Sequence, residues 1–419
     1  MRKTAFPFSH LVVIHYHWRP GGVRKVIELT LPAILRSAPK DLKKLTILSG
    51  SPPSEYPLIN GFGGQVDVRS APAMDYFSEQ SRDPDSIARS IRMALSAVIP
   101  QQEAERTLIW FHNPGLARNV ILNQEVMRFC DKSGSALILH HHDFWCAGRW
   151  ARWQEMERCG ADTLEKAAGI SLGVTDRSVQ VTINLPDFQS LAGAMGERVF
   201  HLPNPVVRPK RVSPSRIENL KKWVEQELET SAPIWVCPTR FLRRKNLLEA
   251  ILLARWLRPD AVFVTTSGKA SDDELPYARM IQEAAERGGW NVRFGILDKP
   301  GAPRVDELLR VAEVTLLTSV QEGFGMGFVE ASASGIPLIA RAIPDVMPDL
   351  EALGFRFPHL YPEVFIAPSL IDIAAESDRQ TRLRLRAKGD FPSVLASRFQ
   401  PAVMDFEQPI AFSRLTWQG

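Results

Sequence analysis

The sequence predicts an α/β protein with two doubly wound, Rossmann-like domains, each built on a parallel sheet, that face each other across a cleft. Short apolar runs of strand length alternate with longer, helix-like windows along nearly all of the 419 residues. This alternation is typical of parallel sheets covered by helices on both faces. A chain of this length also exceeds what one hydrophobic core usually supports, so we expect two or more domains.

The first half contains the apolar runs LVVIHYH, KLTILSG, TLIWFH and ALILHHH, which we expect to be strands. A helix window from Val23 to Leu35 follows the first run. The basic N-terminus could begin a signal peptide, but Ser9, His10 and His15 interrupt its apolar stretch and no small-residue cleavage site follows. A first β-strand is the better interpretation.

One segment, residues 201–216, breaks the alternation with closely spaced prolines and a basic polar stretch. We therefore predict a first domain over 1–205, a linker over 206–230 and a second domain over 231–395. The last segment, 396–419, is expected to pack back on the first domain. Sheets of this kind bind ligands at the carboxyl ends of their strands, so the loops after the strands are the candidate site.

The composition, 45% hydrophobic and 23% charged, is that of an ordinary globular protein, and no apolar run is long enough to cross a bilayer. Residues 1–210 hold 25 Lys and Arg against 20 Asp and Glu, whereas the remainder holds 26 against 27. The basic excess would suit an anionic ligand or peripheral contact with an acidic membrane surface; a solvated helical face is the alternative. No basic stripe indicates nucleic-acid binding.

The four cysteines form no CxxC pair and no dense framework. This usage favours a reducing compartment, so we expect a cytoplasmic protein, peripheral to the inner membrane face if it meets a membrane.

The segment EGFGMGFVE places Glu322 after a predicted strand and Glu330 on the following helix. Gly323 and Gly325 allow the backbone to approach a ligand, and the free N–H groups of the helix start attract phosphate. The alternative is that Glu322 caps the helix and Glu330 is solvated. A dinucleotide fingerprint fails because Phe328 stands where the third glycine is required.

The segment CPTRFLRRKNLLEA leads from a predicted strand, Ile234 to Cys237, into Arg240 and then Arg243 to Lys245 at a helix start. Cations there oppose the helix dipole, but they make a good cradle for a diphosphate. The alternative is an exposed basic turn. Glycines after two apolar runs, Gly22 and Gly268, are further candidate positions for a close approach of ligand to backbone.

Histidines end two strands of the first half: His112, and the run from His140 to Asp143. A zinc site made of these with Cys146 or Cys159 is an alternative, but the spacings match no familiar zinc pattern, so we predict no metal. In RDPDS, the acids could suggest a metal, yet Pro84 and the helix window after it favour an N-cap.

Together these segments resemble the retaining glycosyltransferases of family 4, the glycosyl transferases group 1, which have the two-domain GT-B fold. The matching motifs are E-x7-E at Glu322 and Glu330, Arg-x4-Lys at Arg240 and Lys245, GGV at Gly22, H-x-P at His112, HD at His142 and PNPV at 203–206. The chain departs from the family where Thr239 and Asn246 replace common glycines. It departs again where Arg341 and Ala342 replace a frequent glycine pair, which bears on the shape of the donor-sugar pocket.

The resemblance implies a nucleotide-sugar donor with UDP, GDP or ADP, no cofactor, and a small-molecule, glycan or lipid-linked acceptor. Arg240 and Lys245 would neutralise the diphosphate, Glu330 would accept the ribose hydroxyls and Glu322 would bind the donor sugar. The remaining expected contacts are His112 and His142 on the sugar, and Gly22, Gly268, Gly323, Phe324 and Gly325 on the donor. The alternatives are a glycoside phosphorylase, a non-catalytic sugar-nucleotide-binding subunit and, least favoured, a NAD-dependent oxidoreductase.

Overall fold

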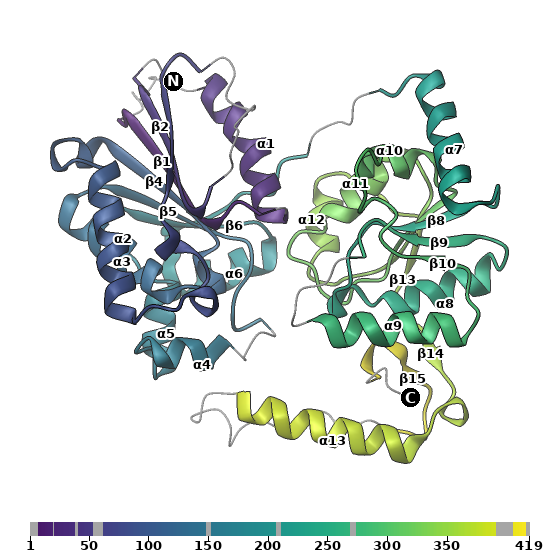
Figure 1. Cartoon of the computed structure of the whole chain (residues 1–419). Helices are drawn as coiled ribbons and strands as arrows, with labels where there is room; N and C mark the ends of the chain where they lie inside the picture. The colour runs from purple at the N-terminus through teal and green to yellow at the C-terminus, as the bar shows by residue number, and fades with distance from the viewer. Residues whose placement is uncertain are drawn as a thin grey trace. The chain divides into compact units, whose positions relative to one another are not determined.

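The computed structural model describes residues 7–19, 21–37, 41–52, 62–147, 152–206, 211–268, 274–390 and 405–415. The chain divides into two compact units, one of Met1–Pro205 with Leu383–Pro401 and one of Val206–Arg382 with Ala402–Gly419 (Figure 1). Within the described ranges, no helix has both the length and the apolar character needed to cross a membrane.

The first unit is built on a seven-stranded, all-parallel sheet in the order β3-β2-β1-β4-β5-β6-β7. Its strands are β1 His10–His17, β2 Lys44–Ser51, β3 Gln65–Ser70, β4 Thr107–His112, β5 Ala136–His141, β6 Ser178–Thr182 and β7 Val199–His201. The strand order reverses between β1 and β4, which is the topological switch point where doubly wound sheets bind ligands.

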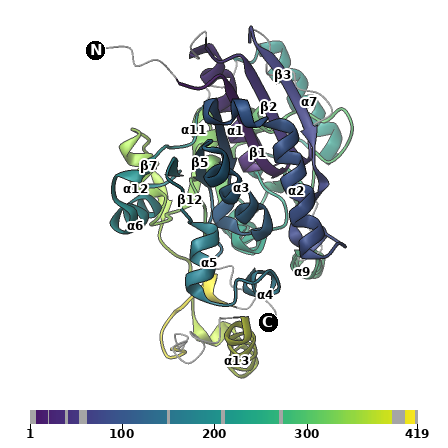
Figure 2. The ribbon, with the colours of Figure 1, turned by 90° about the vertical axis from the view of Figure 1, so that its left-hand side faces the viewer.

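Helices cover both faces of this sheet, as the predicted fold requires. Leu11 and Val13 of β1 face α1 (Gly22–Ser37), whereas Val12 and Ile14 face α2 (Pro84–Val98) and α3 (Val120–Ser133). Figure 2 shows α2 and α3 side by side on their face. The other helices of the unit are α4 Trp153–Arg158, α5 Leu164–Ser171 and α6 Leu185–Met195. The predicted N-cap of α2 is confirmed, because the side chain of Asp83 accepts from the backbone N–H of Ser86 at 2.9 Å.

The second unit has a six-stranded parallel sheet in the order β10-β9-β8-β11-β12-β13. Its strands are β8 Ile234–Cys237, β9 Val262–Thr265, β10 Val292–Arg293, β11 Val314–Leu317, β12 Leu338–Arg341 and β13 His359–Tyr361. Its helices are α7 Pro214–Leu228, α8 Leu247–Leu257, α9 Leu275–Arg287, α10 Val305–Leu308, α11 Met326–Ser334 and α12 Met347–Ala352, and α13 Ile373–Asp390 follows. Helices α8 and α9 pack on one face of the sheet, and α7 and α10 on the other.

Two segments differ from the expectations. Most of the predicted linker, 206–230, is helix α7, which begins at the N-cap Ser213 and buries Leu220, Val224 and Leu228. The sequence signal was misread because Pro214 is favourable at the first helical position. The described part of the C-terminal segment, 405–415, packs in the second unit, where β15 (Ile410–Ala411) pairs with β14 (Phe365–Ile366).

Candidate active site

The E-x7-E segment forms the strand, loop and helix that its pattern predicts. Strand β11 ends at Leu317, and α11 begins at Met326 after an N-cap glycine, Gly325, whose φ is +84°. A side chain at this glycine would be strained, and its Cβ would lie 2.5 Å from Cγ1 of Val346. Among the described residues no side chain caps α11, so the alternative in which Glu322 caps this helix is wrong.

Glu322 lies in the loop after β11 and is held by two cations. Its carboxylate contacts Nζ of Lys245 at 2.5 Å and Nη1 of Arg244 at 2.9 Å. Its side chain is only 15% exposed. Burial by itself would raise the pKa of this carboxyl, but the charges of Lys245 and Arg244 outweigh burial and lower the pKa to about 2. Glu322 is therefore ionised at every physiological pH.

The basic segment 240–245 precedes α8 and does not lie within it. Arg243–Lys245 form a short 3-10 turn, and Asn246 then takes the left-handed conformation before α8 begins at Leu247. The side chain of Lys245 is 18% exposed. Arg240 is exposed and, among the residues that the structure describes, its guanidinium makes no hydrogen bond or ion pair. Arg240 is thus available to a ligand, while Arg244 and Lys245 are anchored by Glu322.

Backbone contacts join the loops after β8 and β11. The hydroxyl of Thr318 donates to the carbonyls of Lys245 and Asn246 at 2.9 and 3.0 Å. The N–H of Val320 donates to the carbonyl of Arg244 at 2.8 Å. These bonds unite two motifs that lie more than 70 residues apart in sequence. Each motif can be recognised in the sequence. The pairing of Arg244 with Glu322 was not predicted, and the only signal for it is that Arg244 lies in the basic run RRK.

The other expected donor contacts of the second unit follow β9 and β11 in the chain. Glu330 is partly buried on α11, Gly323 is partly buried in the loop, and Phe324 is 3% exposed with its ring in the core. Gly268 follows β9 and donates its N–H to Asp298 at 2.8 Å. A Cβ on Gly268 would lie 3.4 Å from Gly295, so close backbone packing is sufficient to explain this glycine.

Gly22 is the first residue of α1 in the first unit and is exposed. A Cβ added there would meet no atom of the described residues within 4 Å, so their packing does not require a glycine at this position.

The expected histidines are brought together in the first unit, but in its interior. His112 ends β4, and its Nδ1 lies 3.1 Å from Nε2 of His142. The ring of His140 lies against both of theirs. These three side chains are at most 5% exposed, and burial lowers the pKa of each, that of His140 to about 3. The three imidazoles are therefore neutral at pH 7.

The same trio is a group whose ring nitrogens could approach a metal, because one nitrogen of each lies within 4.8 Å of the others. The hydrogen bonds do not favour such a site. Trp110, which can only donate, donates to Nδ1 of His140, so the proton of that neutral ring is on Nε2. The nearest nitrogens of His112 and His142 are hydrogen-bonded to each other. A metal on His140 would have to displace the bond from Trp110, whereas Nε2 of His112 has no hydrogen-bond partner among the described residues. Cys146 and Cys159 are not members of the group.

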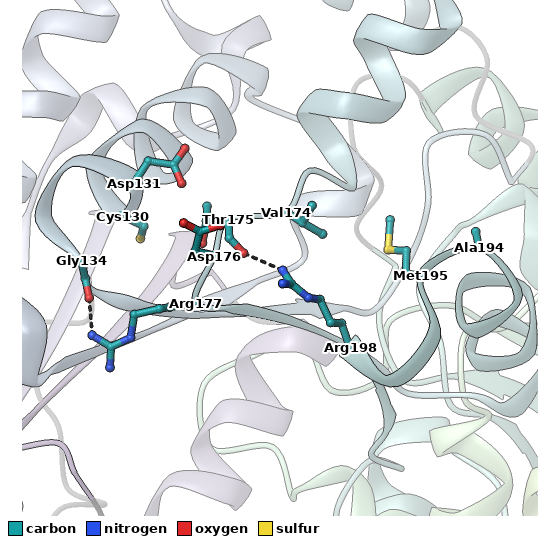
Figure 3. A pocket seen from close by; sticks show the side chains of 10 residues that line it. All are labelled: Cys130, Asp131, Gly134, Val174, Thr175, Asp176, Arg177, Ala194, Met195 and Arg198. Atoms are coloured by element: carbon teal, nitrogen blue, oxygen red, sulfur yellow. Dashed lines mark hydrogen bonds between the residues drawn. The ribbon is translucent and has the colours of Figure 1, made fainter.

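A pocket of about 750 Å³, which the sequence did not lead us to expect, lies in the first unit. Its lining residues precede β5, β6 and β7, so it is at the amino-terminal ends of these strands (Figure 3). Arg177 donates to the carbonyl of Gly134 at 2.5 Å, and Arg198 donates to the carbonyl of Thr175 at 2.9 Å. Asp131 and Asp176 also line it, so the charges of the lining are balanced. This pocket lies away from the carboxyl strand ends that carry the predicted site.

Comparisons with known proteins bear on the fold and on the class of protein. Residues 221–355, about a third of the chain, match the family model for glycosyl transferases group 1. Anabaena HepE, solved with UDP-glucose, has a similar fold with a TM-score of 0.58 at 14% identity, covering 93% of this chain and 94% of that one. Sucrose-phosphate synthase from Thermosynechococcus elongatus gives a TM-score of 0.54 at 14% identity, with 80% and 82% covered. The predicted GT-B fold is therefore confirmed.

The chain is also similar to a mannosylglucosyl-3-phosphoglycerate synthase from Petrotoga mobilis, with 26% identity over 361 residues. The match covers 82% of this chain and 66% of that protein. The chain thus spans about two thirds of the length of this relative. The family match and this relative support a glycosyltransferase.

Proposed function

We propose that the protein is a retaining glycosyltransferase that moves a hexose from a nucleotide sugar to a hydroxyl of a phosphorylated acceptor, without a metal or cofactor. The observation that carries this proposal is that Lys245 and Arg244 form ion pairs with Glu322 in the loops at the carboxyl ends of β8 and β11. These three residues lie inside the region that matches the glycosyl transferase family model.

The charges at these strand ends suit a diphosphate. Residues 240–245 supply four positive charges, of which Glu322 neutralises one. The pyrophosphate of a nucleotide sugar carries about two negative charges, so the local balance is met by side chains. When the glycosidic bond breaks, further negative charge develops on the leaving diphosphate, and fixed cations stabilise it. Arg240, which is exposed and whose guanidinium has no partner among the described residues, is free to turn to it.

Glu322 has two tasks in this proposal. It orients Lys245 and Arg244, and its remaining lone pairs accept from hydroxyls of the donor sugar. Glu330 accepts from the ribose. Retention would follow from attack on the same face that the diphosphate leaves, with a phosphate oxygen taking the proton of the acceptor.

The acceptor class is suggested by the relatives. Mannosylglucosyl-3-phosphoglycerate and sucrose phosphate, the products in the names of two similar proteins, are phosphorylated glycosides. The basic excess of residues 1–210 suits an acceptor of the same kind.

The first test is a thermal-shift panel with UDP, GDP, ADP and their glucose and mannose adducts. A ligand at about a hundred times its Kd should stabilise the protein by about 2.7 kcal/mol. Lys245→Met should remove this shift. Lys299→Met is the matched control, because Lys299 also pairs with a glutamate of the second unit, Glu227, at a different place. No shift with any of the diphosphates or their sugars would overturn the proposal.

The second test measures transfer from the donor that binds to glucose 6-phosphate, glycerol 3-phosphate and 3-phosphoglycerate, with EDTA present. Product with the anomeric configuration of the donor, seen by proton NMR, is expected. Inversion, or activity that EDTA abolishes, would refute the mechanism. Turnover of a sugar 1-phosphate that ignores nucleotides would instead identify a phosphorylase.

A further inference from the structure

Two departures from the family pattern, Asn246 and Arg341, are joined in the structure through one buried carboxylate. We infer that Arg341 is a positioning residue, which acts through Glu249 and Asn246 to fix the loop that presents Lys245 to the diphosphate. The inference rests on the proposed function and adds to it a residue outside the motifs matched above.

Arg341 is the last residue of β12 and is 5% exposed. Its Nη2 pairs with Glu249 and with Glu363, the latter at 2.7 Å, and its Nη1 donates to the carbonyl of Pro362 at 3.1 Å. The hydroxyl of Ser413 donates to the other oxygen of Glu363 at 2.6 Å, so that this carboxylate is itself oriented. The guanidinium is thus held in the interior of the second unit.

A buried ion pair of this kind is weak evidence for stability, because desolvation of the two charges offsets their attraction. Apolar residues of similar size often replace such pairs without loss. The charge of Arg341 therefore points to a task other than stabilising the core, and the partners of Glu249 show which task this is.

Glu249 lies in the first turn of α8 and is fully buried. One of its oxygens accepts from the side-chain amide of Asn246 at 2.7 Å, and the other accepts from the hydroxyl of Tyr361 at 2.6 Å. Asn246 is left-handed, with φ +54°, and follows Lys245 directly. A non-glycine residue keeps this conformation where its surroundings fix it, and the bond to Glu249 is such a constraint.

The other side of the loop is fixed by Thr318, whose hydroxyl donates to the carbonyls of Lys245 and Asn246. The peptide that carries Lys245 is thus clamped between β11 and the carboxylate that Arg341 holds. Its Nζ reaches Glu322 at 2.5 Å from this position. Loss of Arg341 would leave Glu249 without its cation and free Asn246 to turn.

The test compares Arg341→Met and Asn246→Gly with Leu228→Ala. Asn246→Gly keeps the left-handed backbone and removes only the link to Glu249, so it should fold even if Arg341→Met does not. Leu228 is a core residue of α7 on the opposite face of the sheet, and its truncation should destabilise the unit by cavity formation alone. Each variant is measured for its Tm, for amide hydrogen exchange in 240–247, and for its Kd for UDP, GDP and ADP.

Arg341→Met and Asn246→Gly should accelerate exchange in 240–247 and weaken binding of the preferred diphosphate about tenfold, which corresponds to about 1.4 kcal/mol. Leu228→Ala should lower the Tm without either effect. Because both residues act through Glu249, the double variant should be no worse than Arg341→Met alone. Exchange in 240–247 that matches Leu228→Ala, or effects that add fully, would overturn the inference. Exchange needs no ligand, so a wild type that binds no diphosphate would refute the proposed function and leave this test intact.

Discussion

Acidification should unfold the first unit well before the second. Six histidines of the first unit are at most 5% exposed, and burial lowers the pKa of every one. The pKa falls to about 4 for His10 and His141 and to about 3 for His15 and His140. For His112 and His142 the pKa lies well below 6.5. The second unit has a single histidine, His359, and it is exposed.

The sign of the effect follows from proton uptake. In the unfolded chain these histidines protonate near pH 6.5, whereas in the folded unit they stay neutral to about pH 4, so stability falls as the pH falls through this window. Between pH 7 and pH 5 each such histidine should lower the free energy of unfolding by about 1.9 kcal/mol. Six of them lower it by about 11 kcal/mol, which is comparable with the whole stability of a domain, about 5–15 kcal/mol.

The measurement is amide hydrogen exchange at pH 7 and pH 5, corrected for the intrinsic effect of pH and followed by mass spectrometry of peptides from each unit. Peptides of β1, β4 and β5 should lose protection at pH 5, and those of β8 and β11 should keep it. His10→Asn removes one titrating group, so it should reduce the pH-dependent loss by about 1.9 kcal/mol whatever it does at pH 7. Equal protection of the first sheet at both pH values would refute the reasoning.

Three further predictions concern single residues. Glu322→Gln should reduce, by up to about 3 kcal/mol, the free energy of unfolding that the second unit loses as the pH falls from 4.5 to 2, because the folded pKa of this carboxyl is about 2. Urea unfolding at pH 4.5, 3 and 2 measures this loss, and the same loss in the variant and the wild type would contradict the prediction. Gly325→Ala should lower the free energy of unfolding, measured in urea, by about 3 kcal/mol. Gly289→Ala should lower it by about 1 kcal/mol, because Gly289 also has a positive φ but has open space around it. Equal losses would show that the contact of the new Cβ with Val346 is relieved. Asp83→Ala should cost about 1 kcal/mol by loss of the α2 N-cap, and Asp83→Asn almost nothing; a cost shared by both variants would exclude capping as its cause.

Local patterns were sufficient for the elements that carry the site. The expected strand Ile234–Cys237 is β8, and the expected strand and helix of the E-x7-E segment are β11 and α11. Buried parallel strands read as short apolar runs, and Gly335 ends α11 with a φ of +75° as a left-handed cap does. The linker was misjudged, because proline in 206–230 begins a helix as readily as it interrupts one.

The sequence by itself determined the two parallel-sheet units, the loops after their strands, and the types of side chain in those loops, because these depend on periodicity and on the conformational limits of single residues. Only the tertiary structure decided which of these side chains meet. The pairing of Glu322 with Arg244 as well as Lys245, the neutrality of the histidines at the end of β4 and β5, and the place of Arg341 beside Glu249 all depend on distance and burial. Neither quantity is local in the chain, since each is set by how strands far apart in sequence lie next to one another in the sheet.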